Sequence, residues 1–241
     1  MPFMLKKPFL QFVMILLSGC LSSNLIAQSG ECTPFFTFKE GTQWEMHSFN
    51  KRDKLESKMA YKIIEVERSG GKLSAHVSST VYDKKDKVLM DMDYWMHCED
   101  GVYSVDLSSV LGADIMEGFE DMNMEIEGDP LILPSDLSVG MTLPDATTTM
   151  KVSSAGINIM STDVQVTDRK VVDKGDVEVP AGTFEAYEIK STQKIEAGFL
   201  NKEYDYVEYY APDVGMVRSE TYDRKGKLDS YMVLADFDSG K

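Results

Sequence analysis

The stretch that decides the fold is Val88-Leu89-Met90-Asp91-Met92-Asp93-Tyr94-Trp95-Met96-His97-Cys98. Successive side chains of a β-strand point to opposite faces of a sheet, so alternating apolar and polar residues predict a strand with one buried face. The polar side carries Asp91, Asp93 and His97. The predicted inner face carries Val88, Met90, Met92, Tyr94, Met96 and Cys98.

The same alternation extends to both sides of this stretch. Upstream, Trp44 and Met46 alternate with polar residues, and short turns separate the later alternating segments, as in antiparallel sheets. The chain is therefore predicted to be mainly β, with about 10–12 antiparallel strands. Further strands are expected at 55–68, 73–82, 102–107, 121–127, 147–153, 157–172, 184–197, 202–211, 215–223 and 228–237.

A seven-residue pattern occurs three times, at 49–55, 82–88 and 222–228. In each copy an aromatic residue is followed by Asn or Asp, two basic residues, Asp or Gly, a lysine and an apolar residue. The Asn or Asp side chain can cap a turn, and the fifth residue suits the left-handed backbone conformation. The pattern predicts three hairpin turns, and the alternative is that the basic residues form a binding patch.

Two stretches depart from the strand pattern. From Ser108 to Glu120, apolar residues recur at helical spacing after a serine-rich start, which predicts one short helix. Residues 128–146 contain three prolines and little periodicity, so we expect an internal crossover between two groups of strands. One domain over 28–241 is expected, and the crossover is the boundary if there are two.

The first 27 residues have the layout of a secretory signal peptide. Lys6 and Lys7 precede an apolar run, and small and polar residues lead to Ala27. An alternative is cleavage before Cys20, because Leu17-Ser18-Gly19-Cys20 is similar to the site at which bacterial lipoproteins are acylated. We predict export to the periplasm or the medium, or anchoring as a lipoprotein through Cys20.

Composition limits the partners of the mature chain. The signal holds two lysines and no acid, so its removal shifts the formal net charge from −15 to −17. Such a charge repels nucleic acid and anionic membrane surfaces. No stretch after the signal approaches the roughly 20 apolar residues of a membrane-spanning helix. We expect no nucleic-acid partner and no transmembrane segment.

Two cysteines, Cys32 and Cys98, follow the predicted signal. In an oxidising compartment they are expected to form a disulfide, which would tie the mature N-terminus to the sheet. The alternative is two unpaired buried thiols.

The sequence after the signal lacks the short motifs that are typical of metal, catalytic or cofactor sites. His47, His76 and His97 lie in predicted strands without the spacing of a zinc site, so we expect neither a metal nor a cofactor. The chain has no nucleophile elbow, phosphate-binding glycine loop or dinucleotide fingerprint. We therefore predict that the protein is not an enzyme, although carboxylates that meet only in the fold would escape this test.

Thirteen methionines follow the signal, and they allow three interpretations. They can fill the core, bind Cu(I) through their thioethers, or form an adaptable apolar surface for a lipid-like ligand. A cluster of tyrosines, including Tyr204, Tyr206, Tyr209 and Tyr210, either stabilises the sheet through cross-strand contacts or forms a shelf for a ligand.

Several short motifs in order resemble the TapB-type family of exported bacterial proteins of unknown function. They are Cys32-Thr33-Pro34-Phe35-Phe36-Thr37-Phe38-Lys39-Glu40-Gly41, Tyr82-Asp83-Lys84-Lys85, the segment from Leu137 to Ala146, Pro180-Ala181-Gly182-Thr183-Phe184 and Tyr209-Tyr210-Ala211-Pro212-Asp213-Val214-Gly215. The resemblance runs from about Cys32 to Phe237. It implies a single curved antiparallel sheet, a half-barrel or open barrel similar to periplasmic lipoprotein carriers, and it implies a bond between Cys32 and Cys98.

Together these features predict a non-enzymatic envelope protein that binds an apolar molecule, or a lipid-modified partner, on a concave sheet face. The expected lining residues are Trp44, Met46, Met90, Met92, Tyr94 and Met96. The alternative is a structural or interaction module that binds another envelope protein and no small molecule.

Overall fold

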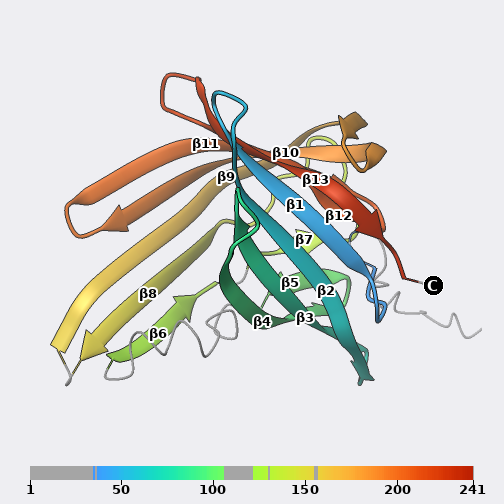
Figure 1. Cartoon of the computed structure of the whole chain (residues 1–241). Helices are drawn as coiled ribbons and strands as arrows, with labels where there is room; N and C mark the ends of the chain where they lie inside the picture. Colours follow the sequence, from blue (N-terminus) through green and yellow to red (C-terminus); the bar gives the residue numbers. More distant parts are fainter. Residues whose placement is uncertain (1–34, 36, 106–121, 130, 155–156, 241) are drawn as a thin grey trace, which may run out of the picture.

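The protein is described by a computed structural model, which covers residues 35, 37–105, 122–129, 131–154 and 157–240. These residues form one antiparallel sheet (Figure 1). Its strands are β1 (Gln43–Asn50), β2 (Leu55–Ser69), β3 (Lys72–Asp83), β4 (Val88–Glu99), β5 (Val102–Val105), β6 (Met122–Gly128), β7 (Leu133–Pro134), β8 (Ala146–Ser154), β9 (Ile157–Val179), β10 (Gly182–Ala197), β11 (Leu200–Ala211), β12 (Gly215–Tyr222) and β13 (Leu228–Asp238).

The strands are ordered β6-β8-β9-β10-β11-β12-β13-β1-β2-β3-β4-β5-β7, so β6 and β7 are the two edges of an open sheet. The predicted fold class is confirmed. The sheet has 13 strands among the described residues, and the strand that alternation could not reveal is β7, which has only two residues. The helix predicted from Ser108 to Glu120 lies outside the described residues.

The three repeated patterns form the predicted hairpin turns. Asp53, Asp86 and Gly226 have φ values of 56°, 63° and 68°, which is the left-handed conformation. In the second copy the Asp83 carboxylate accepts hydrogen bonds from the backbone N–H groups of Lys85 and Lys87, at 2.7 and 3.0 Å. These bonds hold the pKa of Asp83 below its ordinary value.

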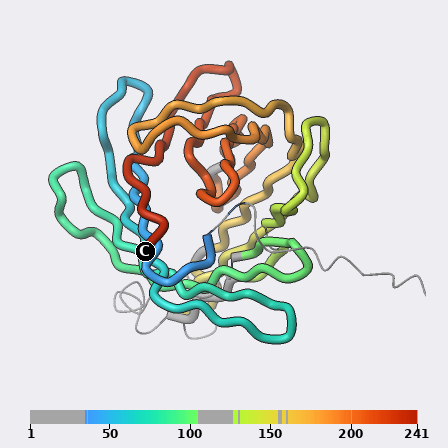
Figure 2. Tube along the Cα trace, turned by 90° about the vertical axis from the view of Figure 1, so that its right-hand side faces the viewer, coloured from blue at the N-terminus to red at the C-terminus, as the bar shows by residue number. Residues whose placement is uncertain are grey.

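The sheet curls, so strands from distant parts of the order share one core, and Figure 2 shows the resulting ring. Val77 on β3, Val171 on β9 and Ile189 on β10 are all completely buried in this core. Residues outside the long strands fill its centre. These are Phe35, Phe38, Leu137 and Leu143.

The crossover between β6 and β8 connects the two halves of the curled sheet. Its β7 pairs with β5 through Leu133 and Tyr103. It then reaches β9, where the N–H of Val171 donates to the carbonyl of Met141 at 2.9 Å. The crossover therefore lies across the inside of the curl and brings its apolar residues into the core.

A second cluster of buried residues lies where the hairpin between β9 and β10 meets β13 and β1. The N–H of Ala181 donates to the carbonyl of Leu234 at 3.2 Å. Val179, Ala186 and Leu234 are buried there, together with Met46. The sheet is thus fixed both by its inner core and by this hairpin.

Candidate functional site

The inner face of the sheet follows from the strand pairing, because directly opposed residues share a face. Met92 and Met96 on β4 lie opposite Ser79 and Ala75 on β3, and Ala75 belongs to the core. The alternate residues of β4 from Met90 to Cys98 therefore point to the inside of the curl. Val88, predicted to belong to the same face, lies beyond a bulge, pairs with Tyr82 and is 48% exposed.

Burial along this inner face changes from one end of a strand to the other. On β4, Cys98 and Met96 are buried, whereas Met92 and Met90 are only half-buried. On β10, Ile189 is completely buried and Ile195, six residues further along the same face, is half-buried. We name the part with fully buried residues the filled half of the concave face, and the part with half-buried residues the open half.

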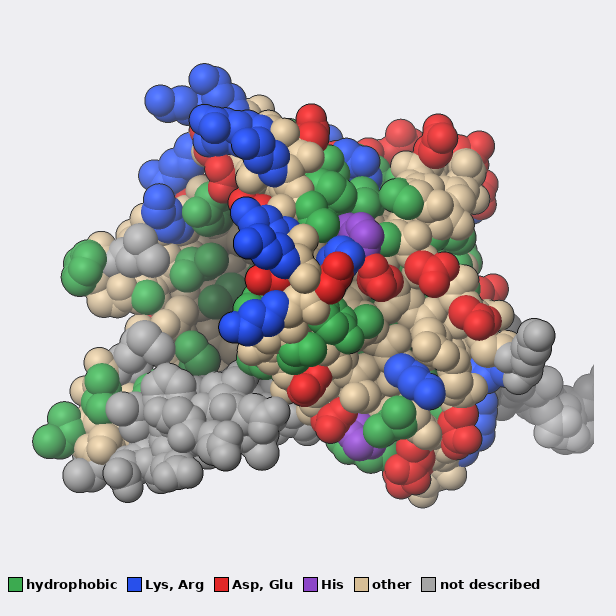
Figure 3. Space-filling model, viewed as in Figure 1, with side chains coloured by type: hydrophobic (Ala, Val, Ile, Leu, Met, Phe, Trp, Pro, Cys, Tyr) green, Lys and Arg blue, Asp and Glu red, His purple; other side chains and the backbone are tan. Residues whose placement is uncertain are grey.

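The open half comprises half-buried residues that the pairing places on the inner face and that do not pack against the inner core. They include Met59, Val81, Met90, Met92, Met150, Val164, Val166, Gln193, Ile195, Tyr204, Tyr206, Thr221 and Met232, of which Met59 and Met232 also pack against the second cluster. Figure 3 shows the surface hollowed between the part that carries β10 and β11 and the part that carries β8, with hydrophobic side chains inside the hollow.

The six residues predicted to line one surface occupy three different places. Met90 and Met92 lie in the open half. Tyr94 and Met96 pack in or against the inner core, and Met46 is buried in the second cluster. Trp44 contacts both clusters. The six residues therefore do not form one continuous surface, because alternation identifies the inner side of a strand and not what covers it.

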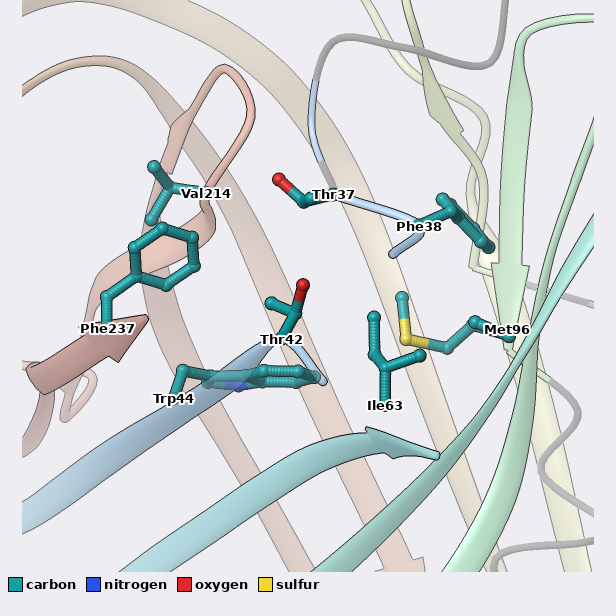
Figure 4. Close-up of a pocket in the computed structure, with 9 residues that line it drawn as sticks. Thr37, Phe38, Thr42, Trp44, Ile63, Met96, Val214 and Phe237 are labelled. Atoms are coloured by element: carbon teal, nitrogen blue, oxygen red, sulfur yellow. The ribbon is translucent and has the colours of Figure 1, made fainter. Parts of the chain in front are cut away.

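Trp44 and Met96 border a cavity within the packed part, together with Phe38, Ile63 and Phe237 (Figure 4). The Trp44 ring stacks on Tyr61 at a centroid distance of 4.9 Å and an interplanar angle of 7°. The cavity measures about 10 Å³, which is room for about one water molecule. It is too small for an organic ligand.

A polar cluster that the sequence did not predict lies on the inner face between the two halves. The phenol of Tyr210 donates to Glu208 at 3.0 Å, and both groups are buried. Burial raises the pKa of the Glu208 carboxyl, with the Tyr210 hydrogen bond and the charge of Arg169 opposing it. The inner face therefore contains a carboxyl group that burial pushes towards its neutral form.

Arg169 joins the sheet to the crossover. Its Nη1 donates to the carbonyls of Ile132 and Pro144, each at 2.9 Å. Desolvation lowers the pKa of the guanidinium, and the nearby Glu208 opposes that change. A deep inward arginine could not be recognised in the sequence, because Asp168 forms a bulge that changes which residues of β9 face inward.

Tyrosines line the transition between the two halves. Burial raises the pKa of Tyr61 and of Tyr206 to about 12, so both phenols stay neutral hydrogen-bonding groups at ordinary pH. Tyr204 and Tyr206 share the inner face, as the alternation predicted. The open half thus combines thioethers and aliphatic side chains with phenols.

The buried acids do not form a catalytic pair. Glu208 lies opposite Ser219, whereas Glu220 lies opposite Val207, so the two carboxyl groups occupy opposite faces of the sheet. Within the described ranges no group of three His, Cys, Asp or Glu residues is arranged to hold a metal ion.

The three histidines lie on strands. The rings of His76 and Trp95 stack at 5.0 Å, and His97 Nδ1 is 2.9 Å from the hydroxyl of Ser74. His47 pairs with Glu45 on β1. Each histidine therefore has a contact partner within the sheet.

Cys98 is completely buried in the filled half and is disulfide-bonded. Its predicted partner, Cys32, lies outside the described residues, so the pairing of Cys32 with Cys98 stays a prediction. In the part of the chain that is described, no helix is long and apolar enough to cross a membrane.

Two solved structures share this architecture. A protein thought to be exported, with a YmcC-like fold, from Bacteroides fragilis NCTC 9343 is 25% identical at a TM-score of 0.69. A protein thought to be a lipoprotein, from Parabacteroides distasonis ATCC 8503, is 22% identical at a TM-score of 0.69, which shows the fold alone. Each comparison covers 86% of this chain and 100% of the other. No curated protein matches the chain, and the family model described as DUF3108-like matches residues 39–234.

Proposed function

The chain belongs to the DUF3108-like family, and from that premise we propose that it is an exported, non-enzymatic envelope protein whose open half binds an apolar or lipid-like molecule. The bound molecule is either free or the acyl chain of a lipid-modified partner protein. Export is supported by the predicted signal and by the exported and lipoprotein character ascribed to the two structural neighbours. The TapB-type resemblance and acylation at Cys20 stay predictions.

The observation that carries this proposal is the change in burial along the inner face. Residues of the same apolar kind are fully packed in the filled half and half-exposed in the open half. A concave apolar surface with a few polar groups is typical of a ligand site. Methionine suits such a surface, because its unbranched thioether adapts to ligands of different shapes.

The arrangement also favours an amphipathic ligand over a plain hydrocarbon. Met90 and Met92 lie on β4, whereas Tyr204 and Tyr206 lie on β11, on the far side of the sheet order. The concave face therefore offers an apolar chain the methionines of β4 and a polar head the phenols of β11. Neutral tyrosines can donate to or accept from such a head.

The experiment is titration of the purified exported protein with dansyl-undecanoic acid, followed by fluorescence. We expect saturable binding that the double variant Met90→Ser, Met92→Ser weakens about tenfold, because two half-buried apolar side chains are lost. Leu89→Ser is the control, since Leu89 is 59% exposed and lies at the bulge between Val88 and Met90 on the same strand. Equal affinity of the double variant and the control would disprove the proposal.

The second candidate is an interaction module without a small-molecule ligand. The observation that favours it is the open sheet, because β6 and β7 are edges whose backbone groups can pair with another chain. Under this alternative the fatty-acid probe does not bind. Native mass spectrometry of the protein would then show an envelope protein partner instead of a lipid.

A further inference from the structure

Two neighbouring hairpins end on the same side of the molecule. One joins β8 to β9 and the other joins β10 to β11, and both reach the left side of Figure 1. Ala197 at the end of β10 pairs with Thr162 on β9. Because β9 begins at Ile157, the first hairpin continues five residues past this pair, which is roughly 16 Å.

These hairpin ends expose large apolar side chains. Phe199 is 105% exposed, Ile157 is 70% exposed and Ile159 is 56% exposed. Single exposed apolar residues are common on protein surfaces, but here three of them lie at the outermost points of two adjacent hairpins. Figure 3 shows hydrophobic side chains at the left extremity of both parts of the molecule.

The charge of the same ends differs from that of the whole chain. Residues 152–162 and 197–201 contain no charged side chain. Over the wider ranges 146–165 and 193–203 there are three lysines and three acids, whereas the chain carries a net charge of −15. Lys194 pairs with Glu196 at 2.7 Å, and Lys151 pairs with Glu127 at 3.0 Å. The outermost residues of both hairpins are thus uncharged, although the protein is strongly acidic.

We infer that the two hairpin ends contact a lipid bilayer and insert Phe199, Ile157 and Ile159 into the boundary between head groups and acyl chains. A bilayer accepts apolar side chains at separate points, whereas a protein partner would need a matching pocket at each of two hairpin ends of different length. Bringing charged side chains into the membrane boundary is costly, and the outermost residues of both hairpins carry none. The contact does not depend on whether the open half binds a ligand.

Few apolar side chains are involved, so the contact is weak and reversible. It favours a membrane of low surface charge, because the remaining surface of the protein is acidic. We therefore expect binding to vesicles of phosphatidylcholine and weaker binding when phosphatidylglycerol is added. Basic peripheral proteins show the opposite order.

The test uses the exported protein with Cys20→Ser in every variant, so that no acyl anchor contributes. Phe199→Trp places a fluorophore at one hairpin end, and phosphatidylcholine vesicles are expected to shift its emission to shorter wavelength. Ile64→Trp is the matched control, because Ile64 is exposed on β2, away from both hairpin ends. A probe that inserts is also quenched by brominated acyl chains, and the control is not.

Binding itself is measured by vesicle co-sedimentation. Phe199→Ser combined with Ile157→Ser and Ile159→Ser is expected to reduce partitioning by about tenfold per apolar side chain. Ile64→Ser with Val139→Ser removes exposed apolar residues elsewhere and is expected to leave partitioning unchanged. Absence of binding by the unsubstituted protein, or equal loss in both variants, would overturn the inference. Self-association through the same residues, seen by analytical ultracentrifugation without lipid, would equally overturn it in favour of a second copy.

Discussion

The filled and open halves of the concave face are built from the same strands but differ in what covers them. Ile189 and Ile195 lie on one face of β10, yet only Ile189 contacts the inner core. The covering residues of the filled half come from the segment before β1 and from the crossover, including Phe38 and Leu143. Strand alternation thus creates an apolar face, and segments outside the strands decide which part of that face is buried.

The largest expected effect compares these two isoleucines directly. Ile189→Ala removes a completely buried side chain, so the free energy of unfolding should fall by about 2–5 kcal/mol. Ile195→Ala should cost less than half as much, because Ile195 is half-exposed before the substitution. Urea denaturation of both variants measures the difference. Equal losses would mean that the open half is packed as tightly as the filled half.

The disulfide of Cys98 lies in the filled half and should stabilise the folded protein. Cys98→Ala is expected to lower the free energy of unfolding by about 2–4 kcal/mol, the typical contribution of a disulfide. Thermal unfolding with and without reductant checks this value. If Cys32 is the partner, Cys32→Ala gives the same loss and the double variant loses no more.

Arg169 lies at the border of the two halves, where it attaches the crossover to the sheet. Arg169→Met leaves the carbonyls of Ile132 and Pro144 without their donor, so we expect a loss of about 1–3 kcal/mol. Amide exchange should accelerate at Leu143 and Val171, whose N–H groups bond between the crossover and β9. Arg68→Met, at an exposed position on β2, is the control. Unchanged exchange at both amides would contradict the role of Arg169.

The sequence predicted the local structure well, because its rules depend on neighbours along the chain. Alternation placed 12 of the 13 strands, and the repeated turn pattern identified the three hairpins with residues in the left-handed conformation. β9 was predicted to end at 172 but continues to Val179. Its last part packs against the second cluster, and its alternation is interrupted by the exposed run Asp173 to Asp176.

The site was less predictable, because it depends on contacts between residues far apart in the sequence. Met90 and Met96 are the same residue on the same face of one strand, yet one is half-exposed and the other is buried. The difference comes from Phe38 and the crossover, which no periodicity on β4 can reveal. The buried Glu208 and Arg169 were missed for the same reason, since a charged residue in an alternating strand is expected to face water.

The smallest expected effect is a change in the pH dependence of stability caused by Glu208. Burial raises its pKa in the folded protein above the ordinary value of 4.5, which describes the unfolded chain. Between these two values the folded state holds a proton that the unfolded state has released, so the free energy of unfolding falls as pH rises. Glu208→Gln cannot titrate, and it should remove this decline, which for one group is at most about 1.4 kcal/mol per pH unit.

Asp83→Asn is the matched comparison, because the pKa of Asp83 is lowered instead. Its carboxylate stabilises the fold above its unfolded pKa of 3.8, and that contribution is lost as pH falls through the lower folded pKa. The two variants should therefore differ from the unsubstituted protein in different ways: the stability difference of Glu208→Gln grows as pH rises above 4.5, whereas that of Asp83→Asn is constant above about pH 4 and shrinks as pH falls below it. Urea denaturation from pH 3 to 8 measures both. A Glu208→Gln curve parallel to that of the unsubstituted protein would show that water reaches this carboxyl, and the boundary between the filled and open halves would then lie deeper in the curl.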